Sequence, residues 1–334
     1  MLGRPAGRWV LSAAAIYPAA IALLLEAVRV IQPRHGPLAL AAVLAMHFAL
    51  ASVVLVPLAF HPQARALRLG LVALAIVGAV RFGDEWVSLP RERAADPASD
   101  FGLLSWNLEA GARPGEAAAE GLRGLDVDVV ALQELGSDHA VAIETDTELK
   151  RRFPYRELVP ADGVFGMGLL SAYPILRTEH VADPVAIEVV LNVAGRPVTV
   201  ITGHPLPGRI GVAGPLPVSF DPSDRDAALE RLRVRVDAAI ARGETVIVVG
   251  DFNVAPTEPA FERLVAGLAD AHAEVGLGPG WTWRPSRFEG LGIGLLRIDL
   301  AFSGPGASPT GVTERCDLPG DHCRLEASFA LEPR

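Results

Sequence analysis

The chain has 334 residues, of which 50% are hydrophobic, and a formal net charge of -9. Its mean hydropathy of +0.32 excludes an intrinsically disordered protein. Two cysteines exclude a disulfide-rich scaffold and a zinc cluster built from several cysteines. The overall acidity argues against tight nonspecific binding of nucleic acid, which depends on arrays of cationic side chains.

Three apolar segments occupy the first 90 residues. Trp9 to Leu25 and Pro37 to Phe60 contain no charged residue, and each is close to the roughly 20 residues that a helix needs to cross a bilayer. The third, Leu69 to Val80, is shorter and crosses only if its flanking arginines extend to the two membrane surfaces. We therefore expect a membrane anchor of about three transmembrane helices over residues 1–90, followed by a polar linker at 91–100.

The charges around these segments predict an orientation. Residues 1–90 carry seven arginines against three carboxylates, a net charge of +4, which leaves -13 for the rest of the chain. With three spans, the arginines on the N-terminal side of the membrane outnumber those between the first and second spans, so the N-terminus is expected in the cytoplasm and the large domain outside. A signal peptide is the alternative for the first segment. It is disfavoured because two more apolar segments follow and no small-residue cleavage site comes after Leu25.

Residues 101–334 alternate between strand and helix patterns. A helix is predicted over 224–242, where four aliphatic side chains share one face. The segment Pro205–Pro222 is rich in proline and glycine and predicts a long loop. Strands interspersed with helices indicate one α/β domain whose sheets are covered by helices. The predicted strands are 101–106, 127–132, 164–172, 186–193, 197–202, 245–249, 297–302 and 324–331.

Polar residues recur where these strands end. Carboxylates and amides that follow apolar strands lie at the rim of a sheet, where α/β proteins bind ligands. Carboxylate and amide oxygens suit Mg²⁺ or Mn²⁺, while histidines beside an aspartate can hold a phosphate and transfer protons. No serine or cysteine nucleophile stands among them, which favours attack by water. The residues are Asn107, Glu109, Glu134, His204, Asp251, Asn253, Asp299, Asp321 and His322.

Each of these residues also has a simpler interpretation. Asp251 could cap the following helix and Asn253 could serve a turn. Glu134 could be an exposed strand end, and His322 a solvent-exposed turn residue. The set taken together, in this order, favours a functional site.

That set resembles the endonuclease/exonuclease/phosphatase superfamily, which has the deoxyribonuclease I-like fold. The resemblance covers about residues 101–331 and depends on motifs in the family's order and spacing. It is strongest to bacterial members with several N-terminal membrane spans, which also carry an arginine at the position of Arg225 and a Thr-Trp pair. The motifs are Ser105-Trp106-Asn107, Leu132-Gln133-Glu134, Gly168-Leu169-Leu170-Ser171, Gly203-His204-Pro205-Leu206-Pro207, Gly250-Asp251-Phe252-Asn253, Arg297-Ile298-Asp299 and Gly320-Asp321-His322, with Thr282-Trp283.

The resemblance implies a four-layer α/β sandwich, in which two packed mixed β-sheets are flanked by helices, over residues 101–334. It implies a bacterial, multi-pass membrane protein that hydrolyses phosphoesters with Mg²⁺ or Mn²⁺. Two positions depart from the family pattern: Gly203 replaces a threonine and Gly320 replaces a serine. Both changes remove a hydroxyl beside the site, and we expect activity to survive.

The resemblance also assigns roles to individual residues. Glu134 binds the metal with help from Asn107, Asp321 lies near the metal or the water, and Glu109 is a further candidate ligand. Asp251 orients or deprotonates the attacking water, and Asn253 holds a phosphate oxygen. His204 and His322 contact the scissile phosphate, with Asp299 steering His322. Residues that could line a pocket for a phosphorylated ligand are Arg284, Arg287, Arg297 and Trp283.

The sequence leaves the substrate open, because related folds act on DNA, RNA, nucleotides, sugar phosphates and phospholipids. The charge predicts no stable complex with nucleic acid, and the anchor predicts contact with a lipid bilayer. The alternative function is a non-catalytic membrane protein that binds phosphorylated ligands in a degenerate pocket; it predicts losses among the motif residues, and none is lost. Cys316 and Cys323 bracket the Asp321-His322 loop and could be paired or free.

Overall fold

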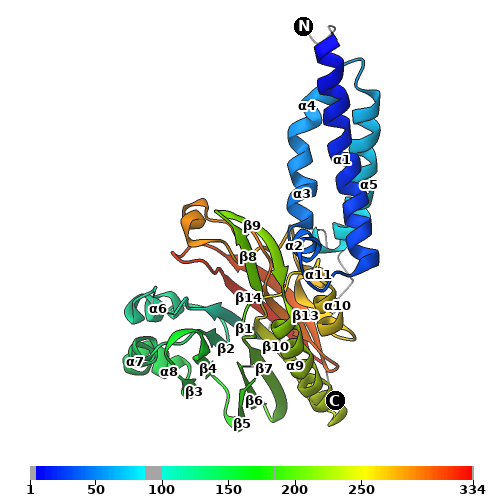
Figure 1. Ribbon diagram of the computed structural model, residues 1–334. Coiled ribbons are helices and arrows are strands. Elements are labelled where there is room, and N and C mark those ends of the chain that lie inside the picture. Colours follow the sequence, from blue (N-terminus) through cyan, green and yellow to red (C-terminus); the bar gives the residue numbers. More distant parts are fainter. Residues whose placement is uncertain (1–4, 87–99, 111, 184, 333–334) are drawn as a thin grey trace. The chain divides into compact units, whose positions relative to one another are not determined.

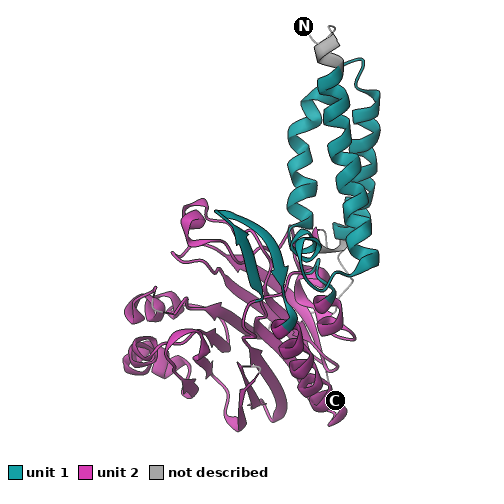
Figure 2. Cartoon of the chain, viewed as in Figure 1, with its two compact units in different colours: residues 1–84, 208–223, 256–259 teal, residues 85–207, 224–255, 260–334 magenta. Residues whose placement is uncertain are grey.

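A computed structural model describes residues 5–86, 100–110, 112–183 and 185–332. These residues form two compact units (Figure 2). Unit 1 contains the N-terminal helices together with residues 208–223 and 256–259, and unit 2 contains the remainder of the chain from Glu85. The expected linker at 91–100 lies outside the described residues except for Asp100, which begins the first strand.

The three apolar segments of unit 1 are helical (Figure 1). Two helices are long and apolar enough to cross a membrane by themselves, over Trp9–Ile31 and Arg65–Gly83. The middle segment forms a pair, Pro37–Val43 and Ala45–Ala59, that bends by 69° and counts as a span only if it is taken as one unit. The helix bounds are α1 (Pro5–Ile31), α2 (Pro37–Val43), α3 (Ala45–Ala51), a 3-10 helix (Ser52–Leu55), α4 (Val56–Ala59) and α5 (Arg65–Trp86).

The structure ranks the three segments as candidate membrane spans in a different order from the sequence prediction. The third segment, expected to be the marginal one, is part of a continuous helix of 22 residues. Arg68 and Arg81 lie within this helix, since arginine is a good helix former. Both guanidiniums bond backbone carbonyls elsewhere in unit 1, Arg68 to Ala59 and His61 and Arg81 to Leu25.

Unit 2 confirms the predicted four-layer α/β sandwich. Its described residues form two six-stranded sheets, with strand orders β13-β14-β1-β2-β4-β3 and β11-β12-β10-β7-β6-β5. Both sheets are mixed, because β1 runs parallel to β2 and β10 runs parallel to β7 while the other pairs are antiparallel. The first sheet comprises β1 (Asp100–Asn107), β2 (Val129–Gln133), β3 (Tyr155–Val159), β4 (Met167–Ser171), β13 (Ala307–Arg315) and β14 (Arg324–Leu331). The second comprises β5 (Ile175–Ala182), β6 (Val185–Val193), β7 (Arg196–Gly203), β10 (Thr245–Asp251), β11 (Ala269–Asp270) and β12 (Asp299–Ser303).

The core of unit 2 lies between the two sheets and under the helices that cover them. One buried cluster joins Leu103 and Leu169 of the first sheet to Val189 and Val249 of the second. A second cluster packs the outer face of the first sheet on one helical layer, and a third packs the outer face of the second sheet on another (Figure 1). These helices are α6 (Gly115–Leu122), α7 (Ser137–Thr145) and α8 (Thr147–Arg152), then α9 (Ser223–Ala241) and α10 (Pro259–Val265), with α11 (Ala271–Val275) beside β13.

The segment expected to be a long loop is instead a β-hairpin, which belongs to unit 1. Strands β8 (Arg209–Ala213) and β9 (Leu216–Asp221) pair antiparallel around a turn at Gly214 and Pro215. Gly214 adopts φ 59, which the turn requires and glycine supplies without strain. The glycines and prolines of this segment lie at the turn and next to a register shift after Gly211. They interrupt the alternating pattern by which the two strands could have been predicted from the sequence.

Candidate active site

The central strands of unit 2 bring the predicted polar residues to one edge. Parallel β1 and β2 end at Asn107 and Gln133, and parallel β7 and β10 end at Gly203 and Asp251. Asp299 opens the antiparallel strand β12 and lies directly opposite Asp251. Both sheets therefore deliver functional side chains to the same place.

Asn107 connects the two sheets at this edge. Its Nδ2 donates to Glu134 Oε1 at 2.9 Å and to Asp251 Oδ2 at 3.0 Å. The second oxygen of Glu134 accepts from the backbone N–H of Ala110 at 2.8 Å. Gln133 makes a second connection below it, donating to Thr202 Oγ1 at 3.1 Å. Neighbouring strands from different sheets are thus held by buried side-chain hydrogen bonds, which fix the carboxylates of the site.

Three residues at the edge have left-handed backbone conformations. Glu109, Glu134 and Asn253 adopt φ values of 52, 55 and 52. Such conformations are uncommon for residues with a side chain and collect at functional sites when the surroundings compensate for the strain. The compensation is visible at Asn253, whose N–H donates to Asp251 Oδ1 at 3.0 Å and whose carbonyl accepts from Arg225 at 2.7 Å.

His204 lies beside the carboxylates with its ring fixed by the backbone. Its Nδ1 lies 3.0 Å from the carbonyl of Val164, so Nε2 faces Asp251 at 3.5 Å and Glu134 at 3.6 Å. Burial opposes protonation, but the two carboxylates outweigh it and raise the pKa of His204. His204 therefore carries a proton more readily than an exposed histidine does.

Asp299 and His322 form a buried pair. Asp299 Oδ2 lies 2.9 Å from His322 Nδ1, and His322 Nε2 lies 3.5 Å from Asp251 Oδ2. Burial opposes protonation of the imidazole, yet Asp299 and Asp251 raise the pKa of His322 to about 10. Burial alone would raise the pKa of Asp251. The positive charge of His322, together with hydrogen bonds from His204 and Asn107, outweighs burial and lowers this pKa. The site thus holds a protonated imidazole against an ionised carboxylate.

Asp321 and Glu109 lie at the rim of the same site. Asp321 accepts from Trp283 Nε1 at 3.4 Å, and its own N–H donates to Glu109 at 3.2 Å. Burial, with the nearby carboxylates of Glu109 and Glu134, raises the pKa of Asp321 to about 6, despite the opposing charge of His322. The charges of Glu109 and Glu134 therefore act on Asp321 at the rim of the site.

The donor atoms fit a divalent cation. Asp299 Oδ1 and Asp321 Oδ1 are buried and have no hydrogen-bond partner among the described residues, which is costly unless a cation or water satisfies them. Ligand atoms of Asp251, Asp299 and His322 lie within 4.8 Å of one another, although a histidine ligand must be deprotonated. Since its neighbours keep His322 protonated, the oxygen atoms around Glu134 suit a hard cation better.

Two of the three arginines predicted to bind substrate have side chains that are already engaged within the protein. Arg297 makes two hydrogen bonds to Asp270, at 2.9 and 3.0 Å, and is buried. Arg284 is fully buried against the Cys323 sulfur and the carbonyl of Leu318. Both serve contacts within the protein, so we leave them out of the substrate site. Of the four predicted residues, Trp283 reaches the cluster through Asp321, and Arg287 is exposed and lies over the ring of Phe288.

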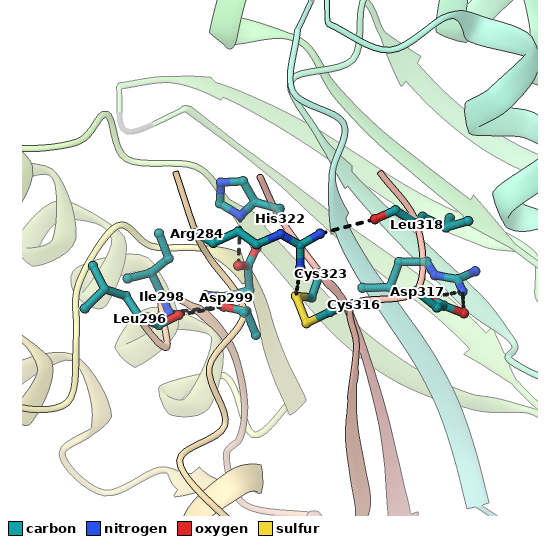
Figure 3. Close-up of a disulfide and its surroundings, with 11 residues drawn as sticks. Arg284, Leu296, Ile298, Asp299, Cys316, Asp317, Leu318, His322 and Cys323 are labelled. Carbon is teal, nitrogen blue, oxygen red and sulfur yellow. Dashed lines mark hydrogen bonds and ion pairs between the residues drawn. A yellow bond between two sulfur atoms is a disulfide. The ribbon is translucent and has the colours of Figure 1, made fainter. Parts of the chain in front are cut away.

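The two cysteines are joined. Cys316 and Cys323 form a disulfide with a Cα–Cα distance of 4.4 Å, and the loop between them carries Asp321 and His322 (Figure 3). The buried Arg284 donates toward Cys323 Sγ and to Leu318 within this loop. The disulfide and the arginine together hold the loop that presents His322 to Asp299.

Sequence reasoning missed two residues that shape the site. Thr282 Oγ1 accepts from the N–H groups of Ile298 and Asp299, at 3.3 and 3.1 Å, and so fixes the start of β12. Arg113 lies over the Trp106 ring at 4.7 Å and close to Gly320. The Thr-Trp pair was noted as a family feature, but nothing in the sequence showed that its hydroxyl supports Asp299.

These features define a class of protein: a four-layer α/β sandwich with a carboxylate and histidine cluster at the meeting edge of its two sheets. A sequence profile of the Endonuclease/Exonuclease/phosphatase family matches residues 104–322, and the chain belongs to this family. Membership supports the hydrolysis of phosphoesters. No curated protein matches the sequence.

Solved structures share the fold at low sequence identity. TDP2 from D. rerio, complexed with a single-strand DNA product, has 18% identity and a TM-score of 0.55, with 69% of this chain and 99% of that one covered. The 3' phosphatase NExo from Neisseria, bound to a product DNA hairpin, has 18% identity, the same TM-score and the same coverage. The human Nocturnin catalytic domain with bound sulfate has 16% identity and a TM-score of 0.51, covering 70% and 95%.

Proposed function

We propose that this protein is a membrane-anchored hydrolase that cleaves a phosphoester by attack of water and depends on a divalent metal, Mg²⁺ or Mn²⁺. The observation that carries the proposal is the position of Asn107, whose amide bonds both Glu134 and Asp251 beside the Asp299–His322 pair. Every motif residue needed for the chemistry is present, which disfavours a degenerate binding protein.

The side chains divide the chemistry between them. Asp251 is ionised and accepts the proton of the attacking water, while Asn107 and the backbone of Asn253 hold its two oxygens in place. His322 is protonated and donates from Nε2 to an oxygen of the phosphoester, while Asp299 accepts from Nδ1 and fixes the orientation of the ring. His204 contributes a second donor facing the same space, and Asn253 is the candidate for holding a phosphate oxygen.

Glu134 and Asn107 are the residues that we propose as metal ligands, with Asp321 and Glu109 as the nearest further carboxylates. A bound Mg²⁺ or Mn²⁺ would neutralise phosphate charge. The Asn107 oxygen and both Glu134 oxygens each accept one hydrogen bond, and each oxygen has a second lone pair to offer.

The contacts within unit 1 support three membrane spans. Phe220 exchanges backbone hydrogen bonds of 2.8 and 3.2 Å with Gly36. Gly36 lies between the first two apolar segments, whereas Phe220 lies between two parts of the catalytic domain in sequence. The Gly36 loop and the catalytic domain therefore share one side of the membrane, so residues 37–86 cross it an even number of times. With α5 as one crossing, the bent α2–α4 segment is the other.

The disulfide supports a location for the catalytic domain outside the cytoplasm. Disulfides persist in oxidising compartments and are rare in the cytosol. The arginine distribution gives the same orientation, with the N-terminus in the cytoplasm. We therefore propose a multi-pass protein whose catalytic domain acts on the outer side of a bacterial cell membrane.

The test is hydrolysis by the full chain in detergent with Mg²⁺, offered DNA, RNA, nucleotides, sugar phosphates and phospholipids. We expect cleavage of one class, abolished by chelation and reduced by about 100-fold or more in Asp251→Asn. Asp237→Asn is the matched control, since Asp237 is half exposed on α9 and pairs with Arg233. Undiminished hydrolysis by Asp251→Asn overturns the assignment, and binding of phosphorylated ligands without any cleavage favours the non-catalytic alternative.

A further inference from the structure

The β8–β9 hairpin has an unusual composition for an exposed element. From Ile210 to Phe220 the sequence contains no ionisable residue, and Ser219 carries its one side-chain hydroxyl. The charged pair Arg209 and Asp221, 2.8 Å apart, closes the base of the hairpin. The hairpin is therefore apolar over its whole length beyond that pair.

Four aliphatic side chains of this hairpin are exposed, while Phe220 near its base is buried. Ile210 is 57% exposed, Val212 66%, Leu216 64% and Val218 42%. Antiparallel hairpins in water normally alternate apolar and polar residues, with the polar ones outward, and contiguous exposed apolar surface marks a site of protein or membrane contact. This hairpin instead exposes apolar side chains where a hairpin in water would expose polar ones.

The segment that pairs with β9 indicates what the exposed apolar side chains of the hairpin contact. Phe220 of β9 and Gly36 exchange two backbone hydrogen bonds, and Gly36 directly precedes α2, which packs on β9 within unit 1. Figure 2 shows the hairpin in the same unit as the helices. Gly36 lies between two segments proposed to cross the membrane, so the backbone of β9 is held where the chain enters the bilayer.

We propose that the tip of the β8–β9 hairpin inserts into the surface of the bilayer that holds the anchor, with Val212 and Leu216 entering the lipid. The proposal rests on the proposed membrane anchoring. Because the hairpin has no basic residue beyond Arg209, burial of apolar surface drives its insertion, and attraction to anionic lipid contributes little. Insertion is therefore insensitive to the charge of the lipid.

This contact constrains the catalytic segment that precedes it. His204 lies only five positions before Arg209 in the sequence, and an extended chain covers at most about 3.6 Å per residue. The covalent chain alone thus keeps His204 within about 18 Å of the hairpin base. A hairpin held in the lipid surface therefore limits how far His204 can lie from the point where the hairpin base meets that surface.

The test uses the full chain reconstituted in phosphatidylcholine vesicles that contain a photoactivatable lipid, with its diazirine near the glycerol end of the acyl chain. Labelled peptides are identified by mass spectrometry. We expect labelling of the hairpin peptide and of α1, with the same hairpin labelling when phosphatidylglycerol replaces half of the phosphatidylcholine. Val212→Asp combined with Leu216→Asp should reduce hairpin labelling about tenfold and leave α1 labelling unchanged. Leu176→Asp, at an exposed position of β5, is the matched control and should retain hairpin labelling.

The outcomes separate this proposal from the proposed function. Labelling of α1 without labelling of the hairpin overturns hairpin insertion, leaves the anchor in place and points to a protein as the hairpin's partner. Absence of both labels overturns the anchor and the insertion together. Hairpin labelling in a protein that hydrolyses nothing supports the insertion while contradicting the catalytic proposal.

Discussion

Asn107 Nδ2 lies 3.0 Å from Asp251 Oδ2, and this hydrogen bond joins the end of β1 in one sheet to the end of β10 in the other. The same amide nitrogen bonds Glu134, so one side chain positions two carboxylates that would otherwise repel each other. The relationship depends on two strands that are 144 residues apart in sequence.

We expect Asn107→Ala to reduce hydrolysis by about 10- to 100-fold, the usual loss when a supporting hydrogen bond at a metal site is removed. Both carboxylates lose a buried donor, so the affinity for Mg²⁺ should weaken as well. Rates measured across a Mg²⁺ titration separate the two effects. Asn192→Ala is the control, since the Asn192 side chain accepts from the Gly195 N–H in the exposed turn after β6. A rate for Asn107→Ala equal to that of the control would show that Asn107 does not position the site.

Asp299→Asn should move the alkaline limit of activity toward neutral pH. The proton on His322 is retained up to a pKa of about 10, because Asp299 and Asp251 outweigh the effect of burial. If the protonated form is active, the wild-type rate falls only as pH rises through this value. Removing the charge of Asp299 lowers the pKa of His322, so the variant should lose activity at a lower pH. The measurement is kcat between pH 6 and about 10.5 at saturating Mg²⁺, and coincident alkaline limbs in the two proteins would exclude His322 as the acid.

The central strands and most of the site could be predicted from sequence, because β1, β2, β7 and β10 are buried over most of their length and are each ended or followed by a polar residue. The strands β3, β5 and β13 were not predicted. They lie at sheet edges and are only partly buried, so their sequences lack a clear apolar run. The hairpin was missed for the reason given above: its glycines and prolines resemble a loop.

Site residues whose role depends on folding could not be read from the sequence. The sequence predicts Arg284 and Arg297 as substrate ligands, because an arginine near a motif offers a charge for phosphate. Only the fold shows that Asp270 and the disulfide loop already occupy them. The Thr282 hydroxyl accepts from the backbone N–H of Asp299 at the start of β12. Neither the residue type nor its spacing in the sequence predicts such a contact.

Gly320→Ser should impair the protein even though it restores the residue that the family pattern has at this position. Gly320 adopts φ 125, and a Cβ there would lie 2.2 Å from Nη2 of Arg113. The loop or the arginine, which lies over Trp106, must move. Gly195→Ser is the control for backbone strain alone, because Gly195 has φ 87 and open space around it. We expect a lower Tm and a lower rate for Gly320→Ser than for Gly195→Ser, and equal values in both assays would show that the contact with Arg113 is unimportant.

Breaking the disulfide should loosen the loop that carries Asp321 and His322 while leaving the rest of unit 2 folded. Closing a loop of this length stabilises a protein by about 2–3 kcal/mol in the chain-entropy treatment, a loss that corresponds to roughly 4–12 °C in Tm for a domain of this size. Cys316→Ser combined with Cys323→Ser should lower Tm by that amount and reduce kcat, because the loop that carries His322 then keeps its hydrogen bonds to Arg284 and Asp299 but loses its covalent closure. A reductant should reproduce both effects in the wild type and change nothing in the double variant. If reduction leaves kcat and Tm of the wild type unchanged, the disulfide does not hold His322 in place.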